Sequence, residues 1–277
     1  MTASNKLLTV KNLGMRFGGI QALSGVDFSI EAGSISALIG PNGAGKTTVF
    51  NCITGFYIPS SGRMELTVQG HPQDLCKVLS AGLFSGSHRV ARIGIARTFQ
   101  NIRLFREMTV LENLLVAQHH HLNHNLLSGF LRTRDYRKSE QEAIDNAMRW
   151  LDVVGLRDCA NRLAGTLPYG HQRRLEIARA MCTHPRLICL DEPAAGLNPQ
   201  ETRELAALIR QLRQAHAATV LLIEHDMGLV MDISDHIVVL DHGKVIAMGS
   251  AQEVANSPAV ILAYLGVDDN QNAKAPI

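Results

Sequence analysis

The chain has 277 residues, of which 46% are hydrophobic and 19% are charged, a composition typical of a globular protein with a substantial core. Its formal net charge of +2 is too small for a dedicated nucleic-acid binder, which usually carries a basic stripe. No apolar run approaches the roughly 18 residues that a membrane span needs, and no apolar signal core follows the N-terminus. We therefore expect a protein kept in the cytosol, whose membrane association comes through partners. The five scattered cysteines lack a C-x-x-C pair and indicate reduced thiols.

The first third of the chain alternates strand and turn signals. Residues 7–33 predict short strands with a turn at Gly18-Gly19, and residues 35–39 form a continuous apolar strand before a glycine-rich loop. Residues 49–53 have helical spacing, and a turn then leads into a strand at 64–68. Residues 71–97 fit neither period clearly.

The later part of the chain changes period twice. From about residue 108 to 162 the pattern is helical and mostly charged, which predicts an inserted helical lobe. From residue 172 onward helices alternate with short apolar strands. Strands that alternate with helices predict a mostly parallel sheet covered on both faces.

Residues 40–47, with the sequence GPNGAGKT, match the phosphate-binding pattern G-x-x-x-x-G-K-[ST]. Glycines let backbone N–H groups turn toward phosphate oxygens, and the following helix directs its positive end at the same anion. Lys46 can pair with the β- and γ-phosphates, and the Thr47 hydroxyl can ligate Mg²⁺. A chance glycine loop is disfavoured because an apolar strand precedes the motif and a helix follows it. The candidate ATP-binding residues are Gly40, Pro41, Asn42, Gly43, Ala44, Gly45, Lys46, Thr47 and Thr48.

A second candidate element is the apolar strand at 187–190, which ends in Asp191 and Glu192. Asp191 is placed to hold Mg²⁺, and Glu192 to act as the base or orienter of the attacking water. Four apolar residues followed by two carboxylates would alone be an ordinary strand end. Their position after a phosphate-binding loop favours the catalytic interpretation.

With these residues in hand, the chain resembles ABC transporter ATPases over nearly its whole length. The resemblance implies an α/β fold, a P-loop NTPase (RecA-like) core with an antiparallel β lobe and an inserted α-helical lobe. It also implies four segments. They are the first part of the ATP-binding core with the β lobe (6–98), the helical lobe after the glutamine loop (99–166), the second part of the core (167–250) and a C-terminal tail (251–277).

The same resemblance implies roles for three further residues. Phe17 falls where the family stacks an aromatic ring on adenine, although alone it would be read as an ordinary strand residue. Gln100 matches the glutamine loop, which touches Mg²⁺ and links the core to the helical lobe. His225 matches the switch histidine that contacts the γ-phosphate. Glu192, His225 and Gln100 are thus the implied catalytic set, and Thr47, Gln100 and Asp191 the implied Mg²⁺ ligands.

The family signature falls at residues 167–174, LPYGHQRR, and departs from the usual L-S-G-G-Q at Pro168, Tyr169 and His171. In the family this helix N-terminus faces the ATP of a partner subunit, a role that Gly170 would take here. The helix dipole is kept, and proline is well tolerated at a first helical position. The serine hydroxyl is lost. Residues 195–198 match the D-loop, expected at a dimer interface.

The resemblance also implies partners. A second ABC ATPase subunit, identical or different, would stack head to tail on this one and trap two ATP molecules. Two integral-membrane permease subunits would hold the pair at the cytoplasmic face of the inner membrane, as a peripheral assembly. A periplasmic or extracytoplasmic binding protein would act indirectly, and no nucleic acid is expected.

Within the family, the chain is most similar to the ATPases of Liv-type branched-chain amino-acid importers. The particular stretches are RTFQNIRLFREMTVLENLLVAQH, the Tyr-Gly signature variant and the tail AYLG. A motor for another cargo, such as urea, amides or a lipid envelope component, stays open because permease and binding protein read the substrate. A soluble ABC ATPase acting on nucleic acid or the ribosome is disfavoured by the single cassette and low charge. Residues 74–87 look like an insertion at the edge of the β lobe.

Two polar clusters have no role in this scheme. His120 and His124 lie one helical turn apart beside His119 and His121, a spacing that can bind a metal, but no carboxylate or cysteine completes a site. A solvated surface is therefore favoured. Arg132, Arg134, Arg137 and Lys138 form a short basic run, solvated or near lipid headgroups.

Overall fold

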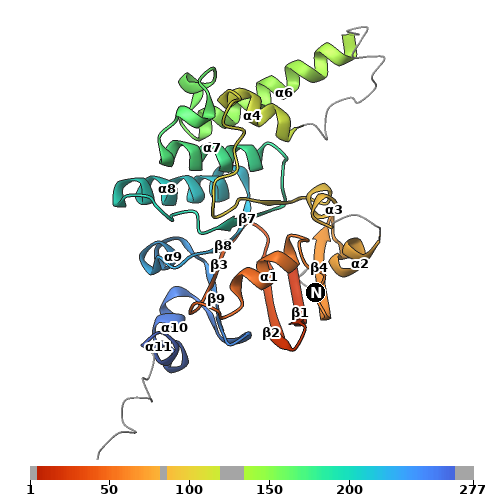
Figure 1. Cartoon of the computed structure of the whole chain (residues 1–277), viewed down its shortest axis with the longest axis vertical. Coiled ribbons are helices and arrows are strands. Elements are labelled where there is room, and N and C mark those ends of the chain that lie inside the picture. The colour runs from red at the N-terminus through yellow and green to blue at the C-terminus, as the bar shows by residue number, and fades with distance from the viewer. Residues whose placement is uncertain (1–4, 82–85, 119–133, 266–277) are drawn as a thin grey trace, which may run out of the picture. The chain divides into compact units, whose positions relative to one another are not determined.

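The computed structural model describes residues 5–81, 86–118 and 134–265. They fall into two compact units (Figure 1), a first unit of residues 1–89 and 221–277 and a second unit of residues 90–220. The histidine cluster at 119–124 lies outside the described residues, as do residues 82–85 of the suspected insertion.

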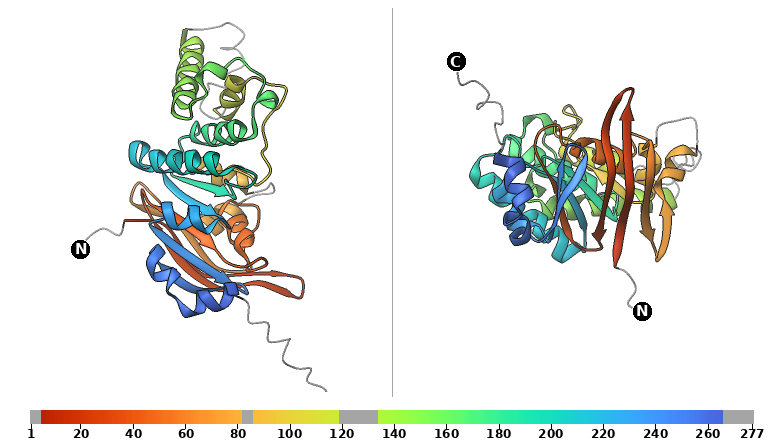
Figure 2. Two further views of the ribbon diagram at one scale, coloured as in Figure 1. Left: turned by 90° about the vertical axis from the view of Figure 1, so that its left-hand side faces the viewer. Right: turned by 90° about the horizontal axis from the view of Figure 1, so that it is seen from below.

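The first unit contains a four-stranded antiparallel sheet in the order β2-β1-β4-β5. Its strands are β1 (Lys6–Phe17), β2 (Ile20–Glu31), β4 (Ser61–Val68) and β5 (His71–Asp74). Val10 of β1 lies opposite Phe28 on one neighbour and Met64 on the other, and all three are buried. Figure 2 shows the long β1–β2 hairpin beside β4. This sheet is the expected antiparallel lobe.

The same unit contains the strand that leads into the glycine-rich loop. β3 (Ile35–Ile39) is buried along its whole length and pairs in parallel with β9 (His236–Asp241), which turns back into antiparallel β10 (Lys244–Gly249). Helix α1 (Lys46–Ile53) follows the loop and buries Val49, Phe50, Cys52 and Ile53. Apolar packing therefore fixes the chain on both sides of the loop.

The described residues between 71 and 97, a range that the sequence left unassigned, form four short elements. They are β5, α2 (Leu75–Ser80), α3 (Ser87–Arg92) and β6 (Ile95–Arg97). The Asp74 side chain accepts hydrogen bonds from the N–H groups of Cys76 and Lys77 and so caps α2. Elements of three to six residues are too short to display a clear hydrophobic period.

The first unit also includes helices near the C-terminus, namely α9 (Met227–Ile233), α10 (Ala251–Ala255) and α11 (Pro258–Leu265).

The second unit is mainly helical. Its helices are α4 (Val110–Ala117), α6 (Arg134–Val153), α7 (Tyr169–Met181) and α8 (Pro199–His216), with 3₁₀ turns η2 (Arg157–Cys159) and η3 (Ala164–Thr166). Helix α6 packs on α4 and α7. β6 pairs in parallel with β7 (Leu187–Asp191). The division between the units falls within β8 (Thr219–Ile223).

Helix α7 begins one residue later than the sequence predicted. Pro168 is its N-cap, with φ −54° and ψ 152°, and not its first helical residue. Because that ψ is extended, Tyr169 becomes the first helical residue. The prediction that Pro168 opens the helix is wrong by one position.

All five cysteines lie in the described residues, and all are free, as predicted. Burial raises the pKa of Cys52 to about 12, and burial also raises the pKa values of Cys182 and Cys189. Over the described ranges, with residues 1–4, 82–85, 119–133 and 266–277 set aside, none of the helices combines the length and apolarity that a bilayer span requires.

Two glycines of the loop after β3 allow a matched stability test. A Cβ at Gly40 would collide with the carbonyl oxygen of Leu240, whereas a Cβ at Gly43, with φ 82°, would meet nothing within 4 Å. We expect Gly43→Ala to lower the free energy of unfolding by about 1–2 kcal/mol through backbone strain alone. Gly40→Ala should lower it by about 1–3 kcal/mol more, because the Leu240 backbone must move. Urea unfolding of the purified chain measures both, and equal losses would contradict the geometry.

Candidate functional site

The glycine-rich loop is shaped by three residues of positive φ. Gly40, Gly43 and Gly45 have φ values of 147°, 82° and 101°, which side-chain-bearing residues rarely adopt. Buried Ala44 anchors the loop, because its N–H donates to Pro41 at 3.2 Å and its carbonyl accepts from Gly243 at 3.0 Å. The first N–H groups of α1 have no partner within the helix, so this end favours an anion.

Lys46 lies across the loop that precedes it. Its Nζ donates to the carbonyl oxygens of Gly40 at 2.7 Å and Pro41 at 2.9 Å. The ammonium is therefore held beside the loop backbone. Thr47 is exposed and Thr48 half-buried in the first turn of α1.

Phe17 belongs to an aromatic pair at the end of β1. Its ring and that of Tyr57 have centroids 5.2 Å apart and planes at 73°, an edge-to-face contact. The Phe17 residue is 42% exposed, so the first unit presents an accessible aromatic ring. Tyr57, which follows α1 and donates its N–H to the Asn51 carbonyl oxygen, is not among the residues predicted from the sequence.

His225 lies in the turn between β8 and α9. The buried carboxylate of Glu224 accepts hydrogen bonds from the N–H groups of His225 at 3.1 Å and Asp226 at 3.3 Å. The imidazole itself is exposed. Glu224, a residue that the sequence analysis did not single out, therefore sets the backbone on which His225 is presented.

In the second unit, Asp191 ends β7 and is paired with Arg97 of β6. The Arg97 Nη2 lies 2.6 Å from the Asp191 Oδ2, and the side chains are only 11% and 10% exposed. The Asp191 N–H donates to the Thr98 hydroxyl at 3.4 Å. This charge-assisted pair fixes the Asp191 carboxylate, and Arg97 is a partner that the sequence did not predict.

Glu192 and Gln100 meet directly. The Gln100 Nε2 donates to the Glu192 Oε2 at 2.8 Å. Glu192 has φ 44°, in the left-handed region that a residue other than glycine occupies only when its surroundings enforce it. Two of the three residues in the implied catalytic set are thus in direct contact within one unit.

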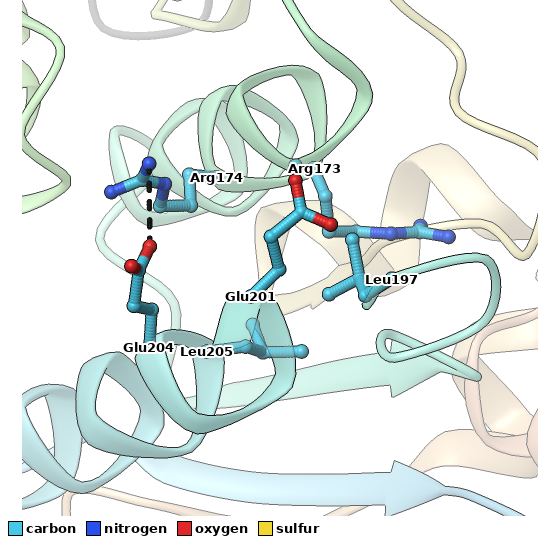
Figure 3. Close-up of a pocket in the computed structure, with 7 residues that line it drawn as sticks. Arg173, Arg174, Leu197, Glu201, Glu204 and Leu205 are labelled. Carbon is cyan, nitrogen blue, oxygen red and sulfur yellow. Dashed lines mark ion pairs between the residues drawn. The ribbon is translucent and has the colours of Figure 1, made fainter. Parts of the chain in front are cut away.

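The first turn of α7 packs against the first turns of α8. Figure 3 shows Glu201 of α8 directed toward α7 and the ion pair between Arg174 and Glu204, whose atoms are 3.7 Å apart. A Cβ at Gly170 would lie 2.6 Å from the Glu201 Oε1, so only glycine fits there without a shift. Glu201 also closes a capping box with Asn198, its Oε2 accepting from the Asn198 N–H at 3.0 Å.

The surroundings of two residues that depart from the usual signature, Tyr169 and His171, are defined by the structure. The Tyr169 ring lies against Gly196 of the predicted D-loop, where a Cβ would be 3.2 Å from the ring. His171 has a buried Nδ1 without a hydrogen-bond partner among the described residues. Burial, followed by the nearby Arg174 cation, lowers the pKa of His171. His171 is therefore suited to the neutral form.

The predicted residues form two sets. Phe17, the loop residues 40–48 and His225 belong to the first unit, and Gln100, Gly170, Asp191 and Glu192 belong to the second. Among the described residues, no group of three or more His, Cys, Asp and Glu side chains forms a metal-binding cluster.

Two family models match the chain. One, described as ABC transporter, matches residues 23–195, and the other, described as branched-chain amino acid ATP-binding cassette transporter, matches residues 244–270. The second match covers α10 and α11, the part of the chain that includes the tail AYLG noted in the sequence.

Curated relatives match nearly the full length. The chain is 55% identical over 266 residues to the high-affinity branched-chain amino acid transport ATP-binding protein BraF of Pseudomonas aeruginosa, covering 95% of this chain and 99% of that protein. It is 53% identical over 263 residues to the corresponding LivG protein of Escherichia coli, with the same coverage of 95% and 99%.

Solved structures agree with the fold. A crystal structure of the ADP conformation of an ATP-binding cassette of an ABC transporter aligns with a TM-score of 0.78 and 33% identity, covering 94% of this chain and 99% of that one. A nucleotide-free cassette aligns with a TM-score of 0.75 and 31% identity over 94% and 99% of the two chains. The predicted P-loop ABC ATPase fold is confirmed. The chain belongs to the ABC transporter family, as one of its ATP-binding cassette ATPases.

Proposed function

We propose that this chain is the ATP-hydrolysing subunit that energises import of branched-chain amino acids by an ABC transporter. The observation that carries this proposal is the 55% identity over 95% of the chain to a transport ATP-binding protein for these amino acids. The match of residues 244–270 to a family model of the same description supports it independently of the nucleotide-binding motifs.

The nucleotide is proposed to bind the first unit's set. Residues 40–48 surround the phosphates, Lys46 supplies a point charge to the β- and γ-phosphates, and Phe17 stacks on adenine. The positive φ values of the loop glycines and the exposure of the Phe17 ring support these assignments.

A magnesium ion is proposed to accompany ATP. The Thr47 hydroxyl, the Gln100 amide oxygen and the Asp191 carboxylate are hard oxygen ligands, which are the donors that Mg²⁺ prefers. The ion would neutralise charge on the phosphates. The Arg97 Nη2 lies 2.6 Å from the Asp191 Oδ2, so the Asp191 carboxylate also has a cationic partner within the chain.

Hydrolysis is assigned to Glu192, Gln100 and His225. Glu192 would accept a proton from the attacking water, and Gln100 would hold its carboxylate in place. The 2.8 Å bond between the two side chains supports this pairing. The exposed His225 imidazole, on a backbone fixed by Glu224, would contact the γ-phosphate.

The working assembly is proposed to contain two cassettes and two membrane permeases. Gly170 at the start of α7 would face the ATP of the second cassette, identical or different. An extracytoplasmic binding protein would deliver the cargo, and the cassettes would lie at the cytoplasmic face of the inner membrane. ATP drives closure of the pair only through its greater affinity for the closed state. We also propose that segments 6–98, 99–166, 167–250 and 251–277 act as the core's first part, helical lobe, core's second part and tail.

Lys46→Ala should weaken ATP binding by about 100-fold or more, because charge-assisted hydrogen bonds contribute about 1.5–3 kcal/mol each. Lys11→Ala, which removes the same charge from an exposed position on β1, is the matched control. Equilibrium titration with a fluorescent ATP analogue measures both. Unchanged affinity of Lys46→Ala would exclude the proposed phosphate cradle.

Glu192→Gln should bind Mg-ATP normally and hydrolyse it about 10²–10⁴-fold more slowly, the usual loss for a general base. The amide keeps an acceptor for Gln100, so geometry is preserved while basicity is removed. Phosphate release by the complete transporter is the measurement. Glu140→Gln on the exposed face of α6 is the control, and near-wild-type turnover of Glu192→Gln would remove Glu192 from the role of base.

Deleting the gene should abolish high-affinity, ATP-dependent leucine uptake and leave proline uptake intact. Radiolabelled uptake at low substrate concentration tests this, with complementation by a wild-type copy and by a Lys46→Ala copy. The wild-type copy should restore uptake and the variant should not. If leucine uptake persists while urea, amide or envelope-lipid transport is lost, the motor assignment stands and the cargo is wrong.

A further inference from the structure

Two buried charges in α7 bind the backbone of the loop that carries Gln100. Arg173 donates from Nη1 to the carbonyl oxygen of Phe99 at 2.7 Å and from Nη2 to that of Gln100 at 2.8 Å. Glu176 accepts from the N–H groups of Phe99 at 3.3 Å and Arg103 at 3.4 Å. The loop therefore receives from α7 the hydrogen bonds that a neighbouring strand or turn would otherwise supply.

The two charges also pair with each other. The Arg173 Nη1 lies 2.9 Å from the Glu176 Oε2, and the side chains are 0% and 1% exposed. Burial raises the pKa of Glu176, an effect that Arg173 and the loop amides oppose. A pair so fully buried contributes little net stability by itself, since desolvation offsets the attraction. Its distinctive feature is the set of loop atoms that it holds. We call Arg173 and Glu176 the clasp.

The clasp lies between two parts of the candidate site. Gln100, whose carbonyl accepts from Arg173, donates its side-chain amide to Glu192. At the other side, the Arg173 Nη2 lies 3.4 Å from the Tyr169 hydroxyl, in the first residue of the signature helix. Arg173 and Arg174 leave α7 in opposite directions (Figure 3), so the neighbouring arginine does not share this contact. One side chain thus touches the glutamine loop and the start of α7.

We propose that the clasp is a positioning device that fastens the glutamine loop to the signature helix, so that displacement of the loop moves Tyr169 and Gly170 with it. The proposal rests on the proposed function, in which the cassette works with membrane permeases, Gln100 contributes to hydrolysis and Gly170 faces a partner's ATP. Arg173 and Glu176 act through Gln100 and Gly170 and touch no nucleotide themselves.

The decisive variant is Arg173→Met/Glu176→Leu, which replaces the charges with apolar side chains of similar volume. Such replacements of buried ion pairs are often neutral or favourable for stability, so a packing role would be preserved. The control is Arg157→Met/Asp152→Leu, which removes an exposed ion pair from the same unit. Both variants lose the same charges, and only the first loses the loop bonds.

Two measurements follow. Hydrogen exchange of the purified cassette should show faster exchange in residues 99–103 for the clasp variant and not for the control. In the complete transporter with a leucine-loaded binding protein, stimulation of ATP hydrolysis over the basal rate should fall about fivefold or more, the lower end of usual coupling effects. The dissociation constant for ATP should change by less than about twofold, because the substituted residues Arg173 and Glu176 are not among those proposed to contact the nucleotide.

Unchanged exchange, or full stimulation with intact ATP affinity, would overturn the proposal. If the double variant fails to fold, Arg173→Lys decides between the outcomes by the same two measurements, because it keeps the charge beside Glu176 but has one nitrogen in place of the two that bond the Phe99 and Gln100 carbonyls. If the wild-type chain binds no ATP, or the wild-type transporter shows no leucine-dependent stimulation, the proposed function fails. The exchange result would then still decide whether the clasp holds the loop.

Discussion

Strands β3, β7 and β8 are buried at every residue, and each is followed at once by a segment that carries candidate chemistry. A strand buried on all sides has a fixed end, so the next residues emerge at a fixed place. Ligand sites of α/β proteins form at such carboxyl ends of strands. The backbone must also turn sharply there, and Gly40, Glu192 and Glu224 meet this requirement in different ways. Glycine accepts the φ, Glu192 is held at φ 44°, and the Glu224 carboxylate binds the N–H groups of the turn.

What the sequence predicted well is local. The phosphate loop and the strand ending in Asp191 each lie within eight or fewer consecutive residues, so spacing alone displays them. The pairs that hold these residues are remote in sequence: Arg97 reaches Asp191 across 94 positions, and Arg173 reaches Gln100 across 73. No periodicity connects such positions. The stretches RTFQNIRLFREMTVLENLLVAQH and LPYGHQRR, which carry the family likeness, contain these arginines, but the likeness gives no physical reason for them.

The signature at residues 167–174 also has contacts with distant residues that its local sequence does not predict. The sequence showed that a serine is replaced by Pro168, and it predicted correctly that a helix N-terminus remains. The placement of Pro168 at the N-cap moves the first helical residue to Tyr169, whose ring meets Gly196. The Glu201 carboxylate lies under Gly170 and accepts from the backbone of Asn198, so the start of α7 and the start of α8 are packed as one piece. A negative group near a helix N-terminus is itself favourable.

The backbone of the loop around Gln100 depends on side chains of α7 for its hydrogen bonds. Four of its backbone polar groups bond to two charged side chains of α7. If the loop moved and α7 did not follow, these groups and both charges would lose partners inside the protein. An unpartnered buried polar group costs about 1–3 kcal/mol, and a charge more. Coupling free energies between sites are typically about 1–3 kcal/mol. Breaking even one of these hydrogen bonds therefore costs as much free energy as the coupling between the sites supplies. Moving the loop and the helix together is the lower-energy response.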